Sequence, residues 1–225
     1  GGNLRVGDVG PGFLTIRNGG AVTNAYAAVG FGTGTTGDVI VTGAGSIWTN
    51  TSELWVGQYG SGTVTIEDGG AVSGLVGAVG LFAGSTGTVT VTGAGSLWTN
   101  SYRLYLGKSG DGALTIADGG AVTAGEVKLA LDAATTGTLN IGAAAGDAAV
   151  AAGSLDTPRI IFGDGSGTLV FNHTSPDFAL DADISGDGTI RLLAGWTRLS
   201  GDSSYTGSTL LEGGTLSLGS DTALG

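Results

Sequence analysis

A few residues have the types and spacing that enzymatic chemistry requires. Residues 201–204 read Gly-Asp-Ser-Ser, close to the Gly-Asp-Ser-Gly pattern around some serine nucleophiles, and His173 is the one histidine of the chain. A nucleophilic serine needs a histidine within hydrogen-bond distance and a carboxylate that orients it. Because the final glycine of the pattern is missing, we interpret residues 201–204 as a turn and expect His173 at a turn or strand end.

Four carboxylates form the one dense acidic group, Asp177, Asp181, Asp183 and Asp187. Paired carboxylates can cleave glycosidic bonds, and Asp-rich turns suit Ca²⁺. The spacing places several of these residues on loops or outward strand positions, where solvated side chains are expected. The glycine-rich residues 163–169 carry Thr where the nonapeptide calcium repeat requires Asp. We therefore predict no catalytic residue, no metal site and no cofactor, and keep a polysaccharide-cleaving enzyme as the alternative.

Aromatic side chains offer a second kind of site, in which ring faces hold a ligand. Trp48 and Trp98 are 50 residues apart, and so are Trp55 and Tyr105. An exposed row of these rings would suit carbohydrate. If 50 residues make two coils of a solenoid, Trp48 and Trp98 lie about 10 Å apart and do not stack. The other interpretation is that they close the corner of the coil and cover an apolar interior.

A unit of 50 residues occurs three times. Leu4-Arg5-Val6-Gly7, Leu54-Trp55-Val56-Gly57 and Leu104-Tyr105-Leu106-Gly107 open the copies, and Gly-Gly-Ala-Val follows at residues 19, 69 and 119. A weaker half-repeat relates Val6 to Val29 and Val29 to Val56, and the second of these two spacings is slightly longer than the first. Fixed-period similarity indicates stacked units that cannot bury their apolar faces alone.

Each coil of about 25 residues alternates apolar with small or polar residues, as in residues 88–92, Thr-Val-Thr-Val-Thr. This period of two is typical of strands with one buried face. Gly makes up 47 of 225 residues and marks frequent tight turns. The predicted fold is all-β, a right-handed parallel β-helix (β-solenoid) of about nine coils and roughly 40 Å length. A propeller with blades of about 40 to 50 residues is the alternative.

Composition limits the function classes. The net charge is −11, so nucleic acid is not an expected partner, and cysteine is absent, so disulfides and thiol chemistry are excluded. Glycine-rich runs open strands and not helices, which argues against phosphate binding. The Thr residues do not form an unbroken Thr-x-Thr row, which argues against an ice-binding face. No apolar run is long enough to span a membrane as a helix.

The repeat pattern changes near residue 145. After Ile141 the third copy no longer follows the repeat motif and becomes rich in alanine and glycine. Acidic residues are more frequent in the sequence that follows. We predict three two-coil repeats in residues 1–145 and a continuing solenoid of another repeat type in residues 146–225. The chain begins and stops within the pattern, so we expect it to be a fragment of a longer array.

Two groups of motifs resemble known repeats. Residues 91–100, Val-Thr-Gly-Ala-Gly-Ser-Leu-Trp-Thr-Asn, and residues 62–72 resemble the repeat of type V secretion (T5SS) and PEP-CTERM-associated proteins. Residues 184–190, 195–201 and 205–216 are similar to the autotransporter-associated β-strand repeat. The resemblance covers nearly the whole chain and implies a β-helical passenger of a Gram-negative autotransporter, exported across the outer membrane through a C-terminal β-barrel that this fragment lacks.

This resemblance implies a non-enzymatic, surface-displayed stalk or adhesin scaffold whose C-terminal repeat assists folding and secretion. The expected location is the bacterial cell surface or the extracellular space. A host surface, matrix or glycan ligand and self-association are the partners considered, and a glycan-binding module is a further alternative. Membrane attachment is expected only through the absent barrel.

Overall fold

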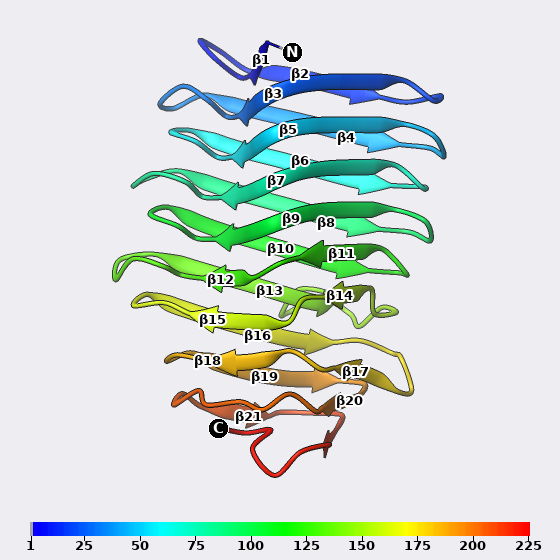
Figure 1. Ribbon diagram of the computed structural model, residues 1–225, viewed down its shortest axis with the longest axis vertical. Coiled ribbons are helices and arrows are strands. Elements are labelled where there is room, and N and C mark those ends of the chain that lie inside the picture. Colours follow the sequence, from blue (N-terminus) through cyan, green and yellow to red (C-terminus); the bar gives the residue numbers. More distant parts are fainter. Residues whose placement is uncertain (1) are drawn as a thin grey trace.

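The computed structural model describes residues 2–225, and all regular structure in this range is β-strand (Figure 1). Sheet A contains ten strands: β1 (Asn3–Val6), β3 (Ala21–Val29), β5 (Ile47–Val56), β7 (Ala71–Val79), β9 (Leu97–Leu106), β11 (Ala121–Ala124), β12 (Val127–Leu129), β14 (Ser154–Asp156), β15 (Arg159–Phe162) and β18 (Asp183–Ser185). Residues 2–225 contain no helix that could cross a membrane.

Two further sheets complete the molecule. Sheet B contains nine strands: β2 (Gly12–Ile16), β4 (Thr36–Thr42), β6 (Ser61–Glu67), β8 (Thr86–Thr92), β10 (Asp111–Ala117), β13 (Thr136–Gly142), β16 (Ser166–Asn172), β19 (Thr189–Ala194) and β21 (Thr209–Leu211). Sheet C contains β17 (Phe178–Leu180), β20 (Trp196–Leu199) and β22 (Thr215–Leu218) near the C-terminal end.

The coils stack in parallel along one axis. Ile16 pairs with Val41, Val41 with Ile66, Ile66 with Val91 and Val91 with Ile116, so equivalent residues of successive repeats lie two strands apart in one sheet. In Figure 1 the sheet A strands run leftward in front and the sheet B strands run rightward behind while the chain descends. This path is right-handed. The predicted parallel β-helix is confirmed, and a propeller is excluded.

Coil length follows the predicted half-repeat in the first six coils. Along sheet B the interval is constant, as Leu14 pairs with Val39 and Val39 with Val64. Along sheet A a shorter interval alternates with a longer one, as Val6 pairs with Val29 and Val29 with Val56. Both patterns match the sequence-based prediction.

The later coils depart from this constant length. Leu139 pairs with Leu169 across a longer coil, because residues 143–153 form an irregular excursion before β14. Leu169 then pairs with Ile190, and Ile190 with Thr209, across coils that are shorter than those of the repeats. Coils of about 25 residues are therefore the average, and individual coils of the C-terminal part are longer or shorter than those of the repeats. Sheet B continues across residue 145 through β13 and β16, whereas the division into two repeat types stays a prediction.

The interior is formed by apolar columns from both sheets. One column of sheet A is fully or nearly fully buried and contains Val6, Val29, Val56, Val79, Leu106 and Leu129. The intervening residues point outward, as period two requires. A register slip of one residue would move every member of such a column to the solvent face, so burial fixes the register.

Close approach between coils selects glycine at the corner that follows each sheet A strand. At Gly80 φ is +73°, and a Cβ would overlap the carbonyl oxygen of Asp111 in the next coil. Gly7, Gly30, Gly57 and Gly107 have the same conformation and the same kind of contact. The sixth coil carries Ala130 at this place, with φ of 50°.

The interior also holds a polar ladder. The Trp48 Nε1 donates to Asn24 Oδ1 at 2.8 Å, and the Asn24 Nδ2 donates to Asn50 Oδ1 at 2.6 Å. In the next repeat Gly74 stands where Asn24 stood, and the buried Trp98 Nε1 and Asn100 amide have no partner. A buried polar group without a partner costs stability, so this second copy of the ladder is incomplete.

We expect Gly74→Asn to complete the ladder and raise the free energy of unfolding by roughly 1 kcal/mol, because each added hydrogen bond contributes on that order. A Cβ at Gly74 meets no atom closer than 3.5 Å, so the side chain has room. Urea denaturation measures the change. Gly74→Ala is the matched control, and an equal gain in that variant would show that backbone entropy, not the amide, is responsible.

We expect Gly80→Ala to lower the free energy of unfolding by about 1–3 kcal/mol or more, because strain at positive φ is joined by a clash with the next coil. Ala130→Gly should raise it by roughly 1 kcal/mol, since glycine tolerates the left-handed region. Gly84→Ala separates the two causes, because φ is +79° there and the space is open. Thermal unfolding that ranks Gly84→Ala as costly as Gly80→Ala would contradict the role of close approach.

Candidate functional site

The four aromatic candidates separate into two buried and two outward-facing residues. Trp48 and Trp98 are 0% and 1% exposed and point into the interior, so neither offers a ring face to a ligand in this structure. Trp55 and Tyr105 lie on the outer face of sheet A and are half-buried. Each is the strand partner of Ala78 in β7, Trp55 from β5 on one side and Tyr105 from β9 on the other. An exposed row of all four rings is therefore not present.

The polar candidates do not converge. The His173 Nε2 contacts Thr197 Oγ1 at 2.9 Å, whereas the Ser203 hydroxyl accepts a hydrogen bond from the Ile184 backbone N–H at 3.2 Å. His173 and Ser203 thus have separate partners, and Ser203 is buried beside a strand. His173 directly follows β16, at a strand end as the sequence predicts, and its side chain is fully buried.

The four aspartates of the acidic group are all exposed. The Asp181 carboxylate accepts a hydrogen bond from Ser200, and Asp183 Oδ1 accepts one from the Asp202 N–H at 2.8 Å. Asp177 precedes β17, and Asp187 lies in the turn before β19. Within residues 2–225, no three His, Cys, Asp or Glu side chains gather in a way that could hold a metal ion.

The outer face of sheet B is rich in hydroxyl groups. Thr63 pairs with Thr88 and Thr65 with Thr90 in adjacent strands. The column that contains Thr63 and Thr88 ends at Asp38 in the strand before Thr63 and at Ala113 in the strand after Thr88. The break in the Thr-x-Thr row agrees with the sequence pattern.

The outer face of sheet A holds an aromatic cluster near the N-terminal end. The rings of Tyr26 and Trp55 have centroids 5.9 Å apart at an interplanar angle of 40°. At the adjoining corner, Tyr59 stacks on Phe82 at 4.5 Å and meets Phe31 edge-on at 6.2 Å. Sequence reasoning found only Trp55 in this cluster.

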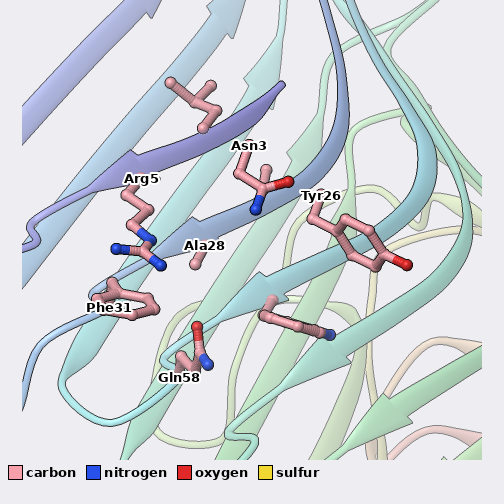
Figure 2. Close-up of a pocket in the computed structure, with 9 residues that line it drawn as sticks. Asn3, Arg5, Tyr26, Ala28, Phe31 and Gln58 are labelled. Carbon is pink, nitrogen blue, oxygen red and sulfur yellow. The ribbon is translucent and has the colours of Figure 1, made fainter. Parts of the chain in front are cut away.

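A shallow pocket of about 230 Å³ opens within this cluster (Figure 2). It lies over Ala28, and we call it the Ala28 pocket. The residues that line it are Asn3, Leu4, Arg5, Tyr26, Ala27, Ala28, Phe31, Trp55 and Gln58. They come from β1, β3 and β5 and from the two turns that follow β3 and β5. A mostly apolar concavity with a few polar groups is the usual form of a small-molecule site.

Two polar side chains define the chemistry of the Ala28 pocket. The Arg5 guanidinium lies 3.8 Å above the Phe31 ring centroid and 3.6 Å from the Asp8 carboxylate. Gln58 is only 6% exposed, and its Oε1 has no hydrogen-bond partner. Figure 2 shows this oxygen directed toward Ala28 and the interior of the pocket. The pocket therefore combines one cation with one free buried acceptor.

The Tyr105 end of the same face is engaged in internal contacts. Arg103 Nη1 donates to the Tyr105 hydroxyl at 2.8 Å, and this bond raises the pKa of Arg103 above its ordinary value. Glu126 Oε1 lies 2.8 Å from Arg103 Nε and 3.5 Å from Lys128 Nζ. The polar groups around Tyr105 therefore bind one another. Around Trp55, by contrast, the Gln58 Oε1 atom has no hydrogen-bond partner.

The pocket residues differ between repeat copies, and this signal was available in the sequence. Arg5 corresponds to Trp55 and Tyr105 in the later copies, whereas the neighbouring, partly buried Leu4 is leucine in all three. Tyr26 corresponds to Val76 and Glu126. A fold requirement would repeat from coil to coil, so outward positions that change are candidates for a local function.

Comparisons with known proteins give one partial likeness. The chain is 40% identical over 93 residues to a protein of Escherichia coli (strain K12) described as the uncharacterized lipoprotein YdeK. The match covers 38% of this chain and 7% of that protein. No protein-family model matches the chain, and no solved structure matches it.

The buried histidine makes stability depend on pH. Burial lowers the pKa of His173 below its ordinary value, and the Ser175 backbone opposes part of the shift. The folded state therefore binds fewer protons than the unfolded chain below pH ~6.5. We expect the contribution of neutral His173 to the free energy of unfolding to be fully present above that pH. This contribution should decrease as pH falls from ~6.5 toward the lowered pKa of His173.

Urea midpoints at pH 7.5 and pH 5.0 measure this loss, because few carboxylates titrate in that interval. His173→Gln keeps a group that can hydrogen-bond to Thr197 and cannot take up a proton. The variant should lose most of the pH dependence. An equal pH dependence in the variant would place the titrating group elsewhere.

Proposed function

We propose that this chain is a non-enzymatic passenger segment of a Gram-negative autotransporter, displayed at the cell surface as a stalk and adhesin scaffold. The observation that carries the proposal is the continuous parallel stack, in which nine strands of sheet B follow one another along the rod. Such an array resists bending because each coil is hydrogen-bonded to its neighbours along its length. A rod of this kind holds other regions at a distance.

The motifs support the secretion route. Residues 91–100 and 184–190 resemble repeats of type V secreted passengers, and each of these segments connects a strand of one sheet to a strand of the other. The Escherichia coli relative is described as a lipoprotein, which supports a location in the bacterial envelope. Display outside the cell goes beyond this relative and belongs to the proposal.

The C-terminal coils are proposed to assist folding during export. Residues 146–225 contain β14 to β22, including sheet C, which adds a third sheet at this end of the rod. Strands such as β13 can then add to β16 through a complete ladder from Thr136 to Gly142. Stackable units of this kind can propagate coil by coil, so folding outside would favour export in one direction.

Surface labelling in the full-length protein tests this function. An epitope tag is inserted after Val9, which is 96% exposed in the turn between β1 and β2. We expect antibody to label intact cells, and deletion of residues 146–225 to reduce that labelling several-fold at equal expression. The total tag, measured after cell lysis, is the control for expression.

Labelling only after the outer membrane is permeabilised would contradict surface display. Undiminished labelling of the deletion variant would contradict the role of the C-terminal coils. Because the tag is upstream of the deletion, both proteins present the same epitope.

A further inference from the structure

We infer that the Ala28 pocket binds one sugar ring that carries a carboxylate, as in a hexuronate or sialate unit of an acidic glycan. This inference rests on the adhesin part of the proposed function and adds a site and a ligand class to it. It is carried by three features of the pocket: a free buried acceptor, aromatic walls and a single cation.

The free acceptor is Gln58 Oε1. A buried amide oxygen without a partner loses its hydration and gains nothing in return, which costs stability. Such groups are rare in folded proteins and commonly mark functional positions. Gln58 lines the pocket and its Oε1 points toward Ala28, so a ligand donor that packs against Ala28 can supply the missing hydrogen bond. A sugar hydroxyl is a donor of this kind.

The walls suit the body of a pyranose ring. Tyr26 and Phe31 lie on opposite sides of Ala28, with Phe31 beneath Arg5 (Figure 2), and the Trp55 ring is 5.9 Å from the Tyr26 ring. Aromatic faces with polar tips pack against the C–H groups of a sugar while leaving its hydroxyls free. A volume of about 230 Å³ is below that of a drug-sized site, so one ring fits and not a whole oligosaccharide.

The cation selects an acidic sugar. Arg5 is the one charged side chain among the nine residues that line the pocket. Its guanidinium has five N–H donors, and in the structure one carboxylate, Asp8, lies near it at 3.6 Å with both side chains about half exposed. Donors therefore remain for a ligand carboxylate, which guanidinium groups bind in a planar fork.

The wider face carries charges of both signs. Five of the eight Lys and Arg residues lie on the outer face of sheet A or in the turn that follows β9, although the chain has a net charge of −11. These five are Arg5, Arg103, Lys108, Lys128 and Arg159. Carboxylates of the same sheet, Glu53, Asp156 and Asp183, lie among them, so the charge that favours an acidic ligand is the local one at Arg5.

A peptide strand is a poorer fit. The backbone groups of β3 beneath the pocket are paired with β1 on one side and β5 on the other, so no strand can add to the sheet at β3. Recognition over β3 must come from side chains, which in this pocket offer ring faces, the Asn3 and Gln58 amides, the Tyr26 hydroxyl and one cation. An acidic peptide is kept as an outcome of the test.

The test titrates the ¹⁵N-labelled chain with two carboxylated probes and follows the tryptophan indole resonances by NMR. A hyaluronan tetrasaccharide supplies hexuronate, and sialyllactose supplies sialate; chitotetraose and lactose are their neutral counterparts. We expect at least one acidic probe to move the Trp55 resonance and to leave the buried Trp48 and Trp98 resonances in place. The neutral probe should bind at least about 10-fold more weakly.

Variants locate the site. Arg5→Gln should weaken the acidic probe about 10-fold or more and leave the neutral probe unchanged, whereas Gln58→Leu should weaken both by about 2- to 10-fold. Lys108→Gln is the matched control, because Lys108 corresponds to Gln58 one repeat later and lies outside the pocket. That control should bind as the parent chain does. Tyr26→Ser, at an exposed position, replaces Gln58→Leu if the latter alters the circular dichroism spectrum.

Several results would overturn the inference. These are an unmoved Trp55 resonance with both acidic probes, equal affinity for acidic and neutral sugars, or an equal loss in Lys108→Gln and Arg5→Gln. A hexaglutamate peptide that binds as well as the sugars would also reject a glycan site. Binding is measured on the purified chain and display on cells, so failure of one is distinguishable from failure of the other.

Discussion

Consecutive coils approach so closely that backbone hydrogen bonding between them decides most of the structure. The constraint is clearest at the corner after each sheet A strand, where Gly80 leaves no space between its own coil and Asp111. A side chain at that corner would push two coils apart and break the ladders on both sides. The glycine spacing, the parallel register and the straight axis all follow from this approach.

Inside the stack, the same closeness couples each residue to its copy in the next coil. Apolar columns satisfy the coupling by packing alone. The Asn24, Asn50 and Trp48 ladder shows that polar residues are also accommodated when each amide finds its partner one coil away. Where Gly74 interrupts the series, Trp98 and Asn100 remain buried without partners. The interior is thus regular where neighbours match and imperfect where one copy has changed.

Outside the stack, residues have more freedom, and function can vary without loss of the fold. Outward positions on sheet A carry Arg5, Trp55 and Tyr105 at equivalent places, while the inward-facing leucine beside each is unchanged. The Ala28 pocket is made from such changed positions. Near Tyr105, by contrast, Arg103 and Glu126 are paired with each other, which leaves fewer free groups. One scaffold therefore presents different chemistry along its length.

The all-β coils, their parallel stacking, their inward apolar columns and the alternation of shorter and longer intervals along sheet A could all be predicted from the sequence, because each depends on local periodicity and on glycine turns. Tertiary structure alone decided which aromatic rings are exposed. Ile47 and Trp48 are adjacent and both apolar, and only the placement of β5 in the stack puts Trp48 inside and leaves Ile47 43% exposed.

Contacts between coils also decided that His173 is buried, that the last coils shorten, and that Arg5 and Gln58 meet at one pocket. Arg5 and Gln58 belong to different copies of the repeat, and no local pattern in the sequence links them. Periodicity therefore predicts which residues face inward, whereas the partners that a side chain meets depend on the coils stacked above and below it.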